Sequence, residues 1–176
     1  MKYIILFTVV VLMIACGTTQ QNNNGVDSKG KPCETISGDF NGDGEIEVAE
    51  LYRLSDDENR ESNIYFTNDS IKSIDSAVIE YSAMYMTNEG DLNGNGTDDI
   101  GLFLYAGESY WGTYAVYSYI GSEWRLLLSF GHNPAWNESP MQELVRKHPT
   151  KSHCVIIKEI SIEQSEMQER EIELPL

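Results

Sequence analysis

The clearest structural signal in the chain is the stretch Thr113-Tyr114-Ala115-Val116-Tyr117-Ser118-Tyr119-Ile120-Gly121-Ser122, followed by Trp124 to Phe130. Its residues fall into two alternating sets: Tyr114, Val116 and Ile120 on one side, and Ala115, Tyr117 and Tyr119 on the other. This alternation is typical of a β-strand, whose successive side chains point to opposite faces. Gly121-Ser122 then predicts a two-residue turn, so the whole stretch predicts a β-hairpin.

Further short apolar runs extend this β pattern in both directions along the chain. We expect strands at residues 64–67, 101–105, 154–162 and 169–174. Residues 48–54 and 77–86 are compatible with either a strand or a short helix, and 141–146 with a short helix. No long helical period occurs anywhere in the sequence, so we expect the secondary structure to be mainly β.

The N-terminus has the features of an export signal. Lys2 is followed by an almost unbroken apolar run from Tyr3 to Ile14, which is too short to span a bilayer. We therefore expect residues 1–15 to be a signal peptide. Ile14-Ala15-Cys16-Gly17 resembles the lipobox of bacterial lipoproteins, and this resemblance implies that Cys16 becomes the lipidated first residue of the mature protein. The alternative is an ordinary secretory signal that happens to contain a cysteine.

The segment after Cys16 has the composition of a tether. Thr18 to Lys31 is rich in Gln, Asn, Gly and Ser and shows no apolar period. Such a segment cannot bury a core. We therefore expect residues 16–32 to form a flexible linker and residues 33–176 a single β-rich domain, which is long enough for a proper core.

The charge of the chain excludes one class of partner. The 176 residues carry 28 Asp and Glu against 12 Lys and Arg, a formal net charge of −16. Removal of residues 1–15 takes away only Lys2 and makes the charge one unit more negative. Such a surface argues against nucleic acid and against docking on anionic lipid through a basic patch, and it suits cation binding.

Two cysteines remain if Cys16 carries a lipid. Cys33 and Cys154 would meet an oxidising compartment in an exported protein, where such a pair can form a disulfide. This bridge would tie the start of the domain to its last strands, with a contribution of about 4–5 kcal/mol in the chain-entropy model. The alternative is a pair of buried free thiols.

Two acidic, glycine-punctuated loops share one design. They read Gly-Asp-Phe-Asn-Gly-Asp-Gly over residues 38–44 and Gly-Asp-Leu-Asn-Gly-Asn-Gly over residues 90–96. Oxygen-bearing side chains fall at positions 1, 3, 5 and 9 of each loop, with glycine at position 6, where the chain must turn sharply. Alternate oxygen donors on a tight loop suit a hard cation such as Ca²⁺, which takes six to eight oxygen ligands.

An EF-hand is one interpretation of the first loop, because Glu50 stands at its twelfth position. An EF-hand needs a helix that enters the loop, and the preceding residues 28–38 contain Gly30, Pro32 and Gly38. These residues make a poor helix.

Both loops resemble the FG-GAP/VCBS calcium-binding repeats of β-propeller proteins over about fifteen residues each. In that family such a loop joins two strands of a blade. The resemblance implies Ca²⁺ ligands at Asp39, Asn41, Asp43, Glu45 and Glu47, and at Asp91, Asn93, Asn95, Thr97 and Asp99. Asn95 replaces an acid, which is expected to weaken the second site. Two repeats cannot close a propeller. We therefore expect a mainly β fold of small antiparallel sheets, as a partial propeller-like stack or a β-sandwich, with few short helices.

Asn-Gly and Asp-Gly are also hairpin turns that need no metal, which is the alternative explanation of both loops. Three carboxylates crowded into the first loop would repel one another without a cation. We therefore expect Ca²⁺ as a structural component of the loops.

No catalytic constellation is present in the sequence: no metal-ligand spacing joins the three histidines to cysteines or acids, and no nucleophile elbow or phosphate loop occurs. We expect a non-catalytic, lipid-anchored envelope protein, outer-membrane in location, with a binding or structural role and a protein or glycan as its ligand. One alternative is a glycan-binding accessory lipoprotein that uses Tyr110, Trp111 or Trp136, although aromatic residues in β domains more often form the core. Another is a small envelope enzyme that would join His132 to an acid.

Overall fold

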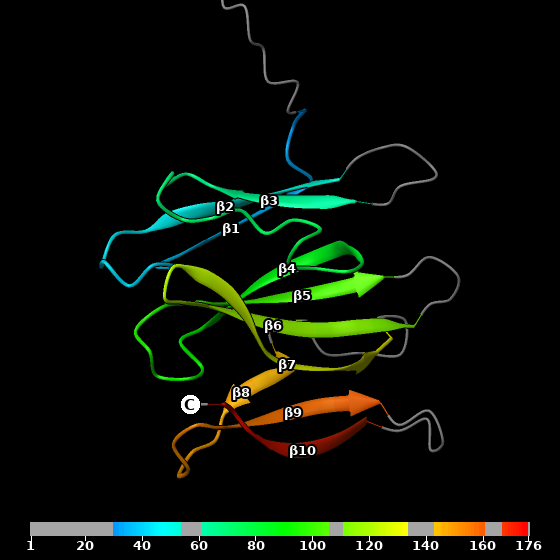
Figure 1. The fold of residues 1–176 in the computed structure, drawn as a ribbon. Helices are drawn as coiled ribbons and strands as arrows, with labels where there is room; N and C mark the ends of the chain where they lie inside the picture. Colours follow the sequence, from blue (N-terminus) through cyan, green and yellow to red (C-terminus); the bar gives the residue numbers. More distant parts are fainter. Residues whose placement is uncertain (1–29, 54–60, 106–110, 134–142, 161–166, 176) are drawn as a thin grey trace, which may run out of the picture.

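A computed structural model of the chain describes residues 30–53, 61–105, 111–133, 143–160 and 167–175. These residues form ten strands in three small antiparallel sheets, which lie one above another as layers (Figure 1). The predicted signal peptide, Cys16 and most of the predicted linker lie outside the described residues.

The first sheet contains three strands in the order β1-β2-β3. These are β1 (Glu34–Gly38), β2 (Glu47–Arg53) and β3 (Ser62–Phe66). The ambiguous residues 48–54 are therefore a strand as far as Arg53, because β2 pairs on both sides and buries alternate residues. Ala49 and Leu51 are the fully buried members of that alternation.

The middle sheet has the order β4-β5-β6-β7. Its strands are β4 (Ser82–Gly90), β5 (Asp99–Tyr105), β6 (Gly112–Ile120) and β7 (Glu123–His132). The predicted hairpin is confirmed as β6 and β7. Gly121 and Ser122 have φ angles of 62° and 65°, the left-handed conformation that the favoured two-residue hairpin turn requires at both central positions.

The third sheet has the order β10-β9-β8. Its strands are β8 (Val145–Lys147), β9 (Cys154–Ile160) and β10 (Met167–Glu173). The closing strand pair is confirmed within the described residues. The short helix expected around 141–146 is wrong at its C-terminal end, because Val145 and Arg146 pair with β9 as strand residues.

Two hydrophobic clusters hold the three layers together. One lies between the first and middle sheets and includes Leu51, Ile64 and Leu102. The other lies between the middle and third sheets and includes Val155 and Ile157. The predicted alternation of β6 is confirmed: Ala115, Tyr117 and Tyr119 belong to the first cluster, and Tyr114, Val116 and Ile120 to the second. The middle sheet is thus buried on both faces, which explains the nearly uninterrupted apolar run of β5.

The fold class predicted from sequence, mainly β with small antiparallel sheets, is confirmed. The arrangement has three layers, where a β-sandwich has two, and it forms no closed barrel. No α-helix occurs in the described ranges, so the few short helices expected are not found there. Accordingly, this part of the chain contains no helix long and apolar enough to span a membrane.

The expected disulfide is not formed. Cys33 is an exposed free cysteine just before β1 in the first layer, and Cys154 is a buried free cysteine at the start of β9 in the third. The middle sheet lies between these two layers (Figure 1). A disulfide requires Cα atoms about 4.4–6.8 Å apart, and stacked sheets are about 10 Å apart for each layer crossed.

Candidate metal centre in two acidic loops

The two acidic loops connect neighbouring antiparallel strands. The first loop (residues 39–47) joins β1 to β2, and the second loop (residues 91–99) joins β4 to β5. Both emerge at the same edge of the stack (Figure 1). The EF-hand interpretation of the first loop is therefore wrong, since a strand enters it and Glu50 lies within β2 and accepts a hydrogen bond from the Tyr52 hydroxyl.

The first position of each loop organises the backbone in the same way. The Asp39 carboxylate accepts hydrogen bonds from the backbone N–H groups of Gly42, Asp43 and Gly44, at 2.8–3.1 Å. The Asp91 carboxylate accepts from the corresponding N–H groups of the second loop, those of residues 94, 95 and 96, at 2.7–3.1 Å. Gly44 and Gly96 have φ angles of 88° and 90°, so glycine at the sixth position is required by the turn.

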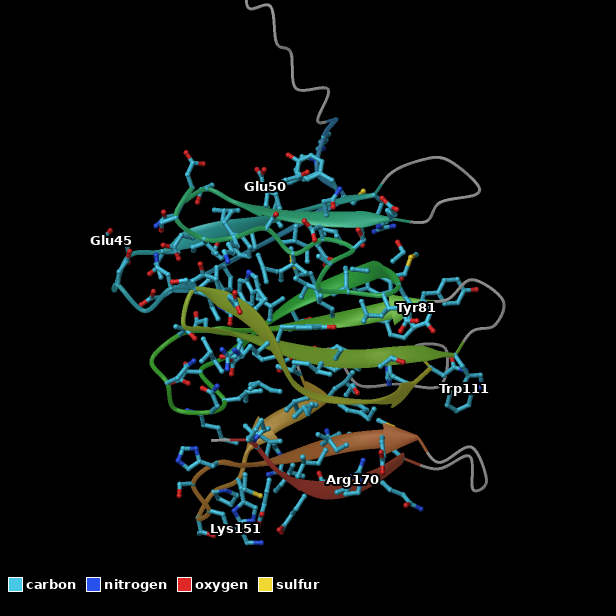
Figure 2. All side chains as sticks on the ribbon, in the orientation of Figure 1. Glu45, Glu50, Tyr81, Trp111, Lys151 and Arg170 are labelled. Carbon is cyan, nitrogen blue, oxygen red and sulfur yellow. The ribbon has the colours of Figure 1, made fainter. Side chains whose placement is uncertain are left out.

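The third and fifth positions continue the shared hydrogen-bond pattern. The side-chain oxygens of Asn41 and Asn93 accept from the backbone N–H two residues further on. Those of Asp43 and Asn95 do the same towards the seventh position. At the seventh position itself the loops differ: Glu45 is exposed at the edge of the molecule (Figure 2), whereas Thr97 is buried and its hydroxyl donates to Asn95. The two loops are thus one local structure with different side chains.

The ninth position carries a buried acid in both loops. Glu47 is 3% exposed and Asp99 is 0% exposed. Each uses one carboxylate oxygen to accept the backbone N–H of the second loop residue: Phe40 donates to Glu47 at 3.0 Å and Leu92 to Asp99 at 2.8 Å. Glu47 and Asp99 differ in the hydrogen-bond partners of their second carboxylate oxygen.

The second oxygen of Glu47 is satisfied by protein groups. The side-chain amides of Asn41 and Asn68 donate to Oε1 at 3.0 and 3.1 Å. The Asn41 amide also donates to Asp43 at 2.9 Å. The Asn41 amide therefore links the carboxylates of Asp43 and Glu47. These hydrogen bonds reduce the repulsion between the two charges, so the first loop has less need of a cation than the sequence indicated.

The second oxygen of Asp99, Oδ1, is buried and has no hydrogen-bond partner among the described residues. The amides of the second loop do not reach it, because Asn93 and Asn95 both donate to the hydroxyl oxygen of Ser118 on β6, at 3.1 and 3.0 Å. Burial raises the pKa of Asp99 to about 6, although the Ser118 hydroxyl and the backbone N–H groups of Leu92 and Asn93 partly offset this rise. The carboxylate thus has an unmet demand for positive charge, which a proton or a metal ion would meet.

The second loop contains the types of oxygen donor that bind a cation. Asp91, Asn93, Asn95 and Asp99 present carboxylate and amide oxygens, the ligands that Ca²⁺ prefers. Among the described residues, no three His, Cys, Asp or Glu side chains converge as a metal centre. Of the predicted ligands in the second loop, only Asp91 and Asp99 are acids, so the remaining donors would have to be amide, hydroxyl, backbone or water oxygens.

The two loops are also bonded to each other through Asp98, which the sequence analysis did not single out. The backbone N–H of Asp98 donates to the Asp39 carbonyl at 2.7 Å, and the Asp39 N–H donates to the Asp98 carboxylate at 3.1 Å. Asn88 on β4 donates to the same carboxylate and to the Ser37 carbonyl. Gly42 lies against Gly96 and Thr97, close enough for a Cβ there to come within 3.0 Å of the Gly96 carbonyl oxygen. The loops form one continuous unit.

A second acid without a cationic partner lies near Asp99. Glu89, at the end of β4, accepts a hydrogen bond from the Tyr114 hydroxyl. Burial raises the pKa of Glu89 to about 7, which the tyrosine hydrogen bond partly offsets, and the nearby Asp99 charge raises it further. Sequence could not reveal this pair, since Glu89 and Tyr114 are brought together only by the sheet.

The aromatic residues near the predicted glycan-binding residues differ in their burial. Tyr114, Tyr117, Tyr119 and Trp124 are core residues. Trp111 is half-buried and lines a hollow of about 230 Å³ together with Tyr81, whose side chain is exposed on the edge opposite Glu45 (Figure 2). Tyr110 and Trp136 lie outside the described residues.

In the described part of the chain, His132 forms no hydrogen bond with an acid, which the enzyme alternative would require. His132 is buried against the rings of Phe103 and Tyr114, and neither ring nitrogen has a hydrogen-bond partner. His148 contacts Glu171 at 3.3 Å on the third sheet.

No protein-family model, curated protein or solved structure matches this chain. The likeness to FG-GAP/VCBS repeats therefore rests on the loop residues themselves.

Proposed function

We propose that this protein is a calcium-stabilised, non-catalytic β module in which the second loop holds the metal. The observation that carries the proposal is the unpartnered, fully buried Oδ1 atom of Asp99. A divalent ion bound there would replace the missing hydrogen bonds and neutralise a charge that burial disfavours. In the first loop the need for a metal ion is weaker, because both carboxylate oxygens of Glu47 accept hydrogen bonds from protein groups.

The metal would act as a structural staple rather than as a signal. Extracellular calcium modules bind at about 10⁻⁴–10⁻³ M. The second loop precedes β5, a central strand of the doubly covered sheet, and Asp99 is the first residue of that strand. A bound ion would therefore fix the start of β5 and, through Asp98, the first loop beside it.

Calorimetric titration of the purified protein with CaCl₂ tests the proposal. We expect a binding heat with a Kd of about 10⁻⁴–10⁻³ M and a rise in melting temperature, since about 100 Kd of free ligand stabilises the folded state by about 2.7 kcal/mol. MgCl₂ should bind more weakly, because Mg²⁺ gives up its water ligands reluctantly. No heat and no thermal shift at millimolar Ca²⁺ would overturn the proposal.

Two matched variants assign the metal to its loop. Asp99→Asn should abolish the calcium response and leave the metal-free protein as stable as before or more stable, since it removes a buried charge. Glu47→Gln makes the same change at the same position of the first loop and should keep calcium binding. An equal loss in both variants, or retention in Asp99→Asn, would contradict the assignment to the second loop.

We propose a cell-envelope location for this module, lipid-anchored through Cys16, most simply on the outer membrane. The support is the lipobox-like Ile14-Ala15-Cys16-Gly17 after an apolar run, and the polar segment that follows it. Metabolic labelling with a fatty-acid analogue should mark the wild-type protein and not Cys16→Ser. Unchanged labelling in the variant would exclude Cys16 as the anchor.

A second candidate function is glycan binding. It is favoured by the hollow between Tyr81 and Trp111, because exposed aromatic faces stack on sugar rings. A glycan array probed with the wild-type protein and with Trp111→Ala would separate it from a purely structural role. An array without bound glycans would leave the structural role alone.

A further inference from the structure

A hollow between the second loop and the third sheet lies on the same edge of the stack as the acidic loops. It has a volume of about 450 Å³ and is bounded by residues 92–94 of the second loop and by residues 147–154, which connect β8 to β9. Lys151, on this connection, projects at the lower end of that edge (Figure 2). A hollow of this size is large enough for a small molecule.

The lining of this hollow has a charge opposite to that of the chain. Asp and Glu outnumber Lys and Arg by 28 to 12 overall, yet none of the eleven lining residues is an acid. Two lysines and two histidines are among them: Lys147, His148, Lys151 and His153. The two histidines and two lysines therefore concentrate positive or protonatable groups at one place on an acidic protein.

The four basic residues have different roles. The His148 Nδ1 atom accepts the backbone N–H groups of Thr150 and Lys151 at 3.2 and 3.0 Å, so its other nitrogen is the one that donates to Glu171. His148 thus shapes the connection. Lys151 forms an ion pair with the same glutamate.

Lys147 is the cation of this hollow without an internal counter-charge. It is exposed, and the described residues offer it no ion pair. Beside it His153 is exposed in the left-handed conformation, with a φ angle of 54°, and its carbonyl accepts the backbone N–H of Leu174 at 2.7 Å.

We propose that this hollow binds a small molecule that carries an oxyanion, a phosphate or a carboxylate, with Lys147 as its principal charged contact. Lys151 and His153 supply further donors, and the hydroxyls of Thr150 and Ser152 line the same hollow. An ammonium group binds phosphate and carboxylate as a point charge and needs no fixed orientation. The volume that the oxyanion leaves free accommodates a body of about the size of a sugar ring.

The test uses four probes on the purified protein: inorganic phosphate, glucose 6-phosphate, glucuronate and, as the neutral control, glucose. Binding is followed by NMR chemical shifts, with calcium and again with a chelator, so that failure of the calcium proposal leaves this result readable. We expect at least one anionic probe to bind and glucose not to bind. Preference for the phosphate or for the uronate identifies the oxyanion.

Lys147→Gln should weaken the binding of the preferred probe roughly tenfold, as loss of a charge-assisted contact does. Lys158→Gln is the matched control, because Lys158 lies in the same sheet, pairs with Glu143 at 3.6 Å and does not line the hollow. It removes the same charge and should change the Kd less than twofold. The proposal is overturned if no anion binds, or if both variants weaken binding equally.

Discussion

His132 is buried without a hydrogen bond to its ring nitrogens, which lowers the stability of the folded protein in acid. It is 0% exposed at the end of β7, lies edge-on to Phe103 at a ring distance of 5.8 Å, and has no hydrogen bond at either nitrogen. Burial lowers its pKa from 6.5 to about 4. The unfolded chain therefore binds a proton at this residue below about pH 6.5, whereas the folded chain does not until about pH 4. The contribution of His132 to stability is present above pH 6.5 and is lost as the pH falls towards 4.

We predict that His132→Phe reduces this loss of stability in acid. At pH 7 the variant should be as stable as the wild type or about 1 kcal/mol more stable, because an unsatisfied polar ring is replaced by an apolar one. At pH 5 its relative advantage should be about 2 kcal/mol larger. Urea unfolding at the two pH values measures the difference.

His153→Gln is the control for this prediction, since His153 is exposed and should not reproduce the effect. The same pH dependence in wild type and His132→Phe would show that His132 does not titrate between these states as described.

At this scale, sequence could predict the pattern of donors in the loops but not their partners. Positions 1, 3, 5, 6 and 9 are set by local backbone geometry, so the spacing sufficed to locate them. Whether the ninth residue is satisfied depends on distant groups: Asn68, beyond β3, completes the set around Glu47, and Ser118 on β6 draws the amides away from Asp99. These contacts exist only in the folded chain, so the sequence favoured the first loop for its three carboxylates.

At the scale of the elements, Gly101 on β5 leaves the space that the hydrogen-bonded pair Glu89 and Tyr114 occupies. Gly101 pairs with Val116, and a Cβ at residue 101 would overlap the Tyr114 hydroxyl and come within 2.8 Å of a Glu89 carboxylate oxygen. The neighbouring strands cannot move apart to accommodate it, because β5 is hydrogen-bonded on both sides. Glycine at this position is required by the approach of its neighbours.

We predict that Gly101→Ala destabilises the protein by about 1–3 kcal/mol, as overpacking of a core does. Gly131→Ala is the matched control on β7, where a Cβ would meet nothing within 4 Å and φ is not positive. It should change stability by a few tenths of a kcal/mol. Thermal unfolding of both variants checks the difference, and equal effects would refute the role assigned to Gly101.

Elements with a local signal were predicted and those with a non-local one were not. The β6–β7 hairpin has its alternation and its turn within one stretch of sequence. Residues 48–54 lacked such a signal, and their strand conformation follows from pairing with β1 and β3. The three-residue strand β8 was missed, since its only sequence-distant support is the pairing with β9.

At the scale of the whole molecule, the two acidic loops join the first and middle sheets by polar contacts. These contacts add to the hydrophobic cluster that lies between the same two sheets. Asp98 is central to this junction, because its backbone and carboxylate bond to Asp39 and its carboxylate also accepts from Asn88. The layer order could not be predicted from sequence, since no pattern within one strand specifies which sheet covers it. The duplicated loops suggested only that similar units recur.

We predict that Asp98→Ala lowers the free energy of unfolding by about 1–3 kcal/mol, because it leaves the Asp39 N–H and the Asn88 amide without this acceptor. Asp69→Ala removes the same charge from an exposed position and should have little effect. Denaturant unfolding measures both. If the two substitutions cost the same, the effect comes from charge and not from the junction.

Each layer consists of strands that are consecutive along the chain: β1 to β3, β4 to β7, and β8 to β10. The polypeptide therefore passes from one layer to the next only twice. Most strand pairings join near neighbours in sequence, which favours rapid assembly. A chain that emerges N-terminus first, as during synthesis or the export proposed above, can complete the hydrogen bonds of one layer before the next has arrived. Each arriving layer then covers the apolar face left open by its predecessor.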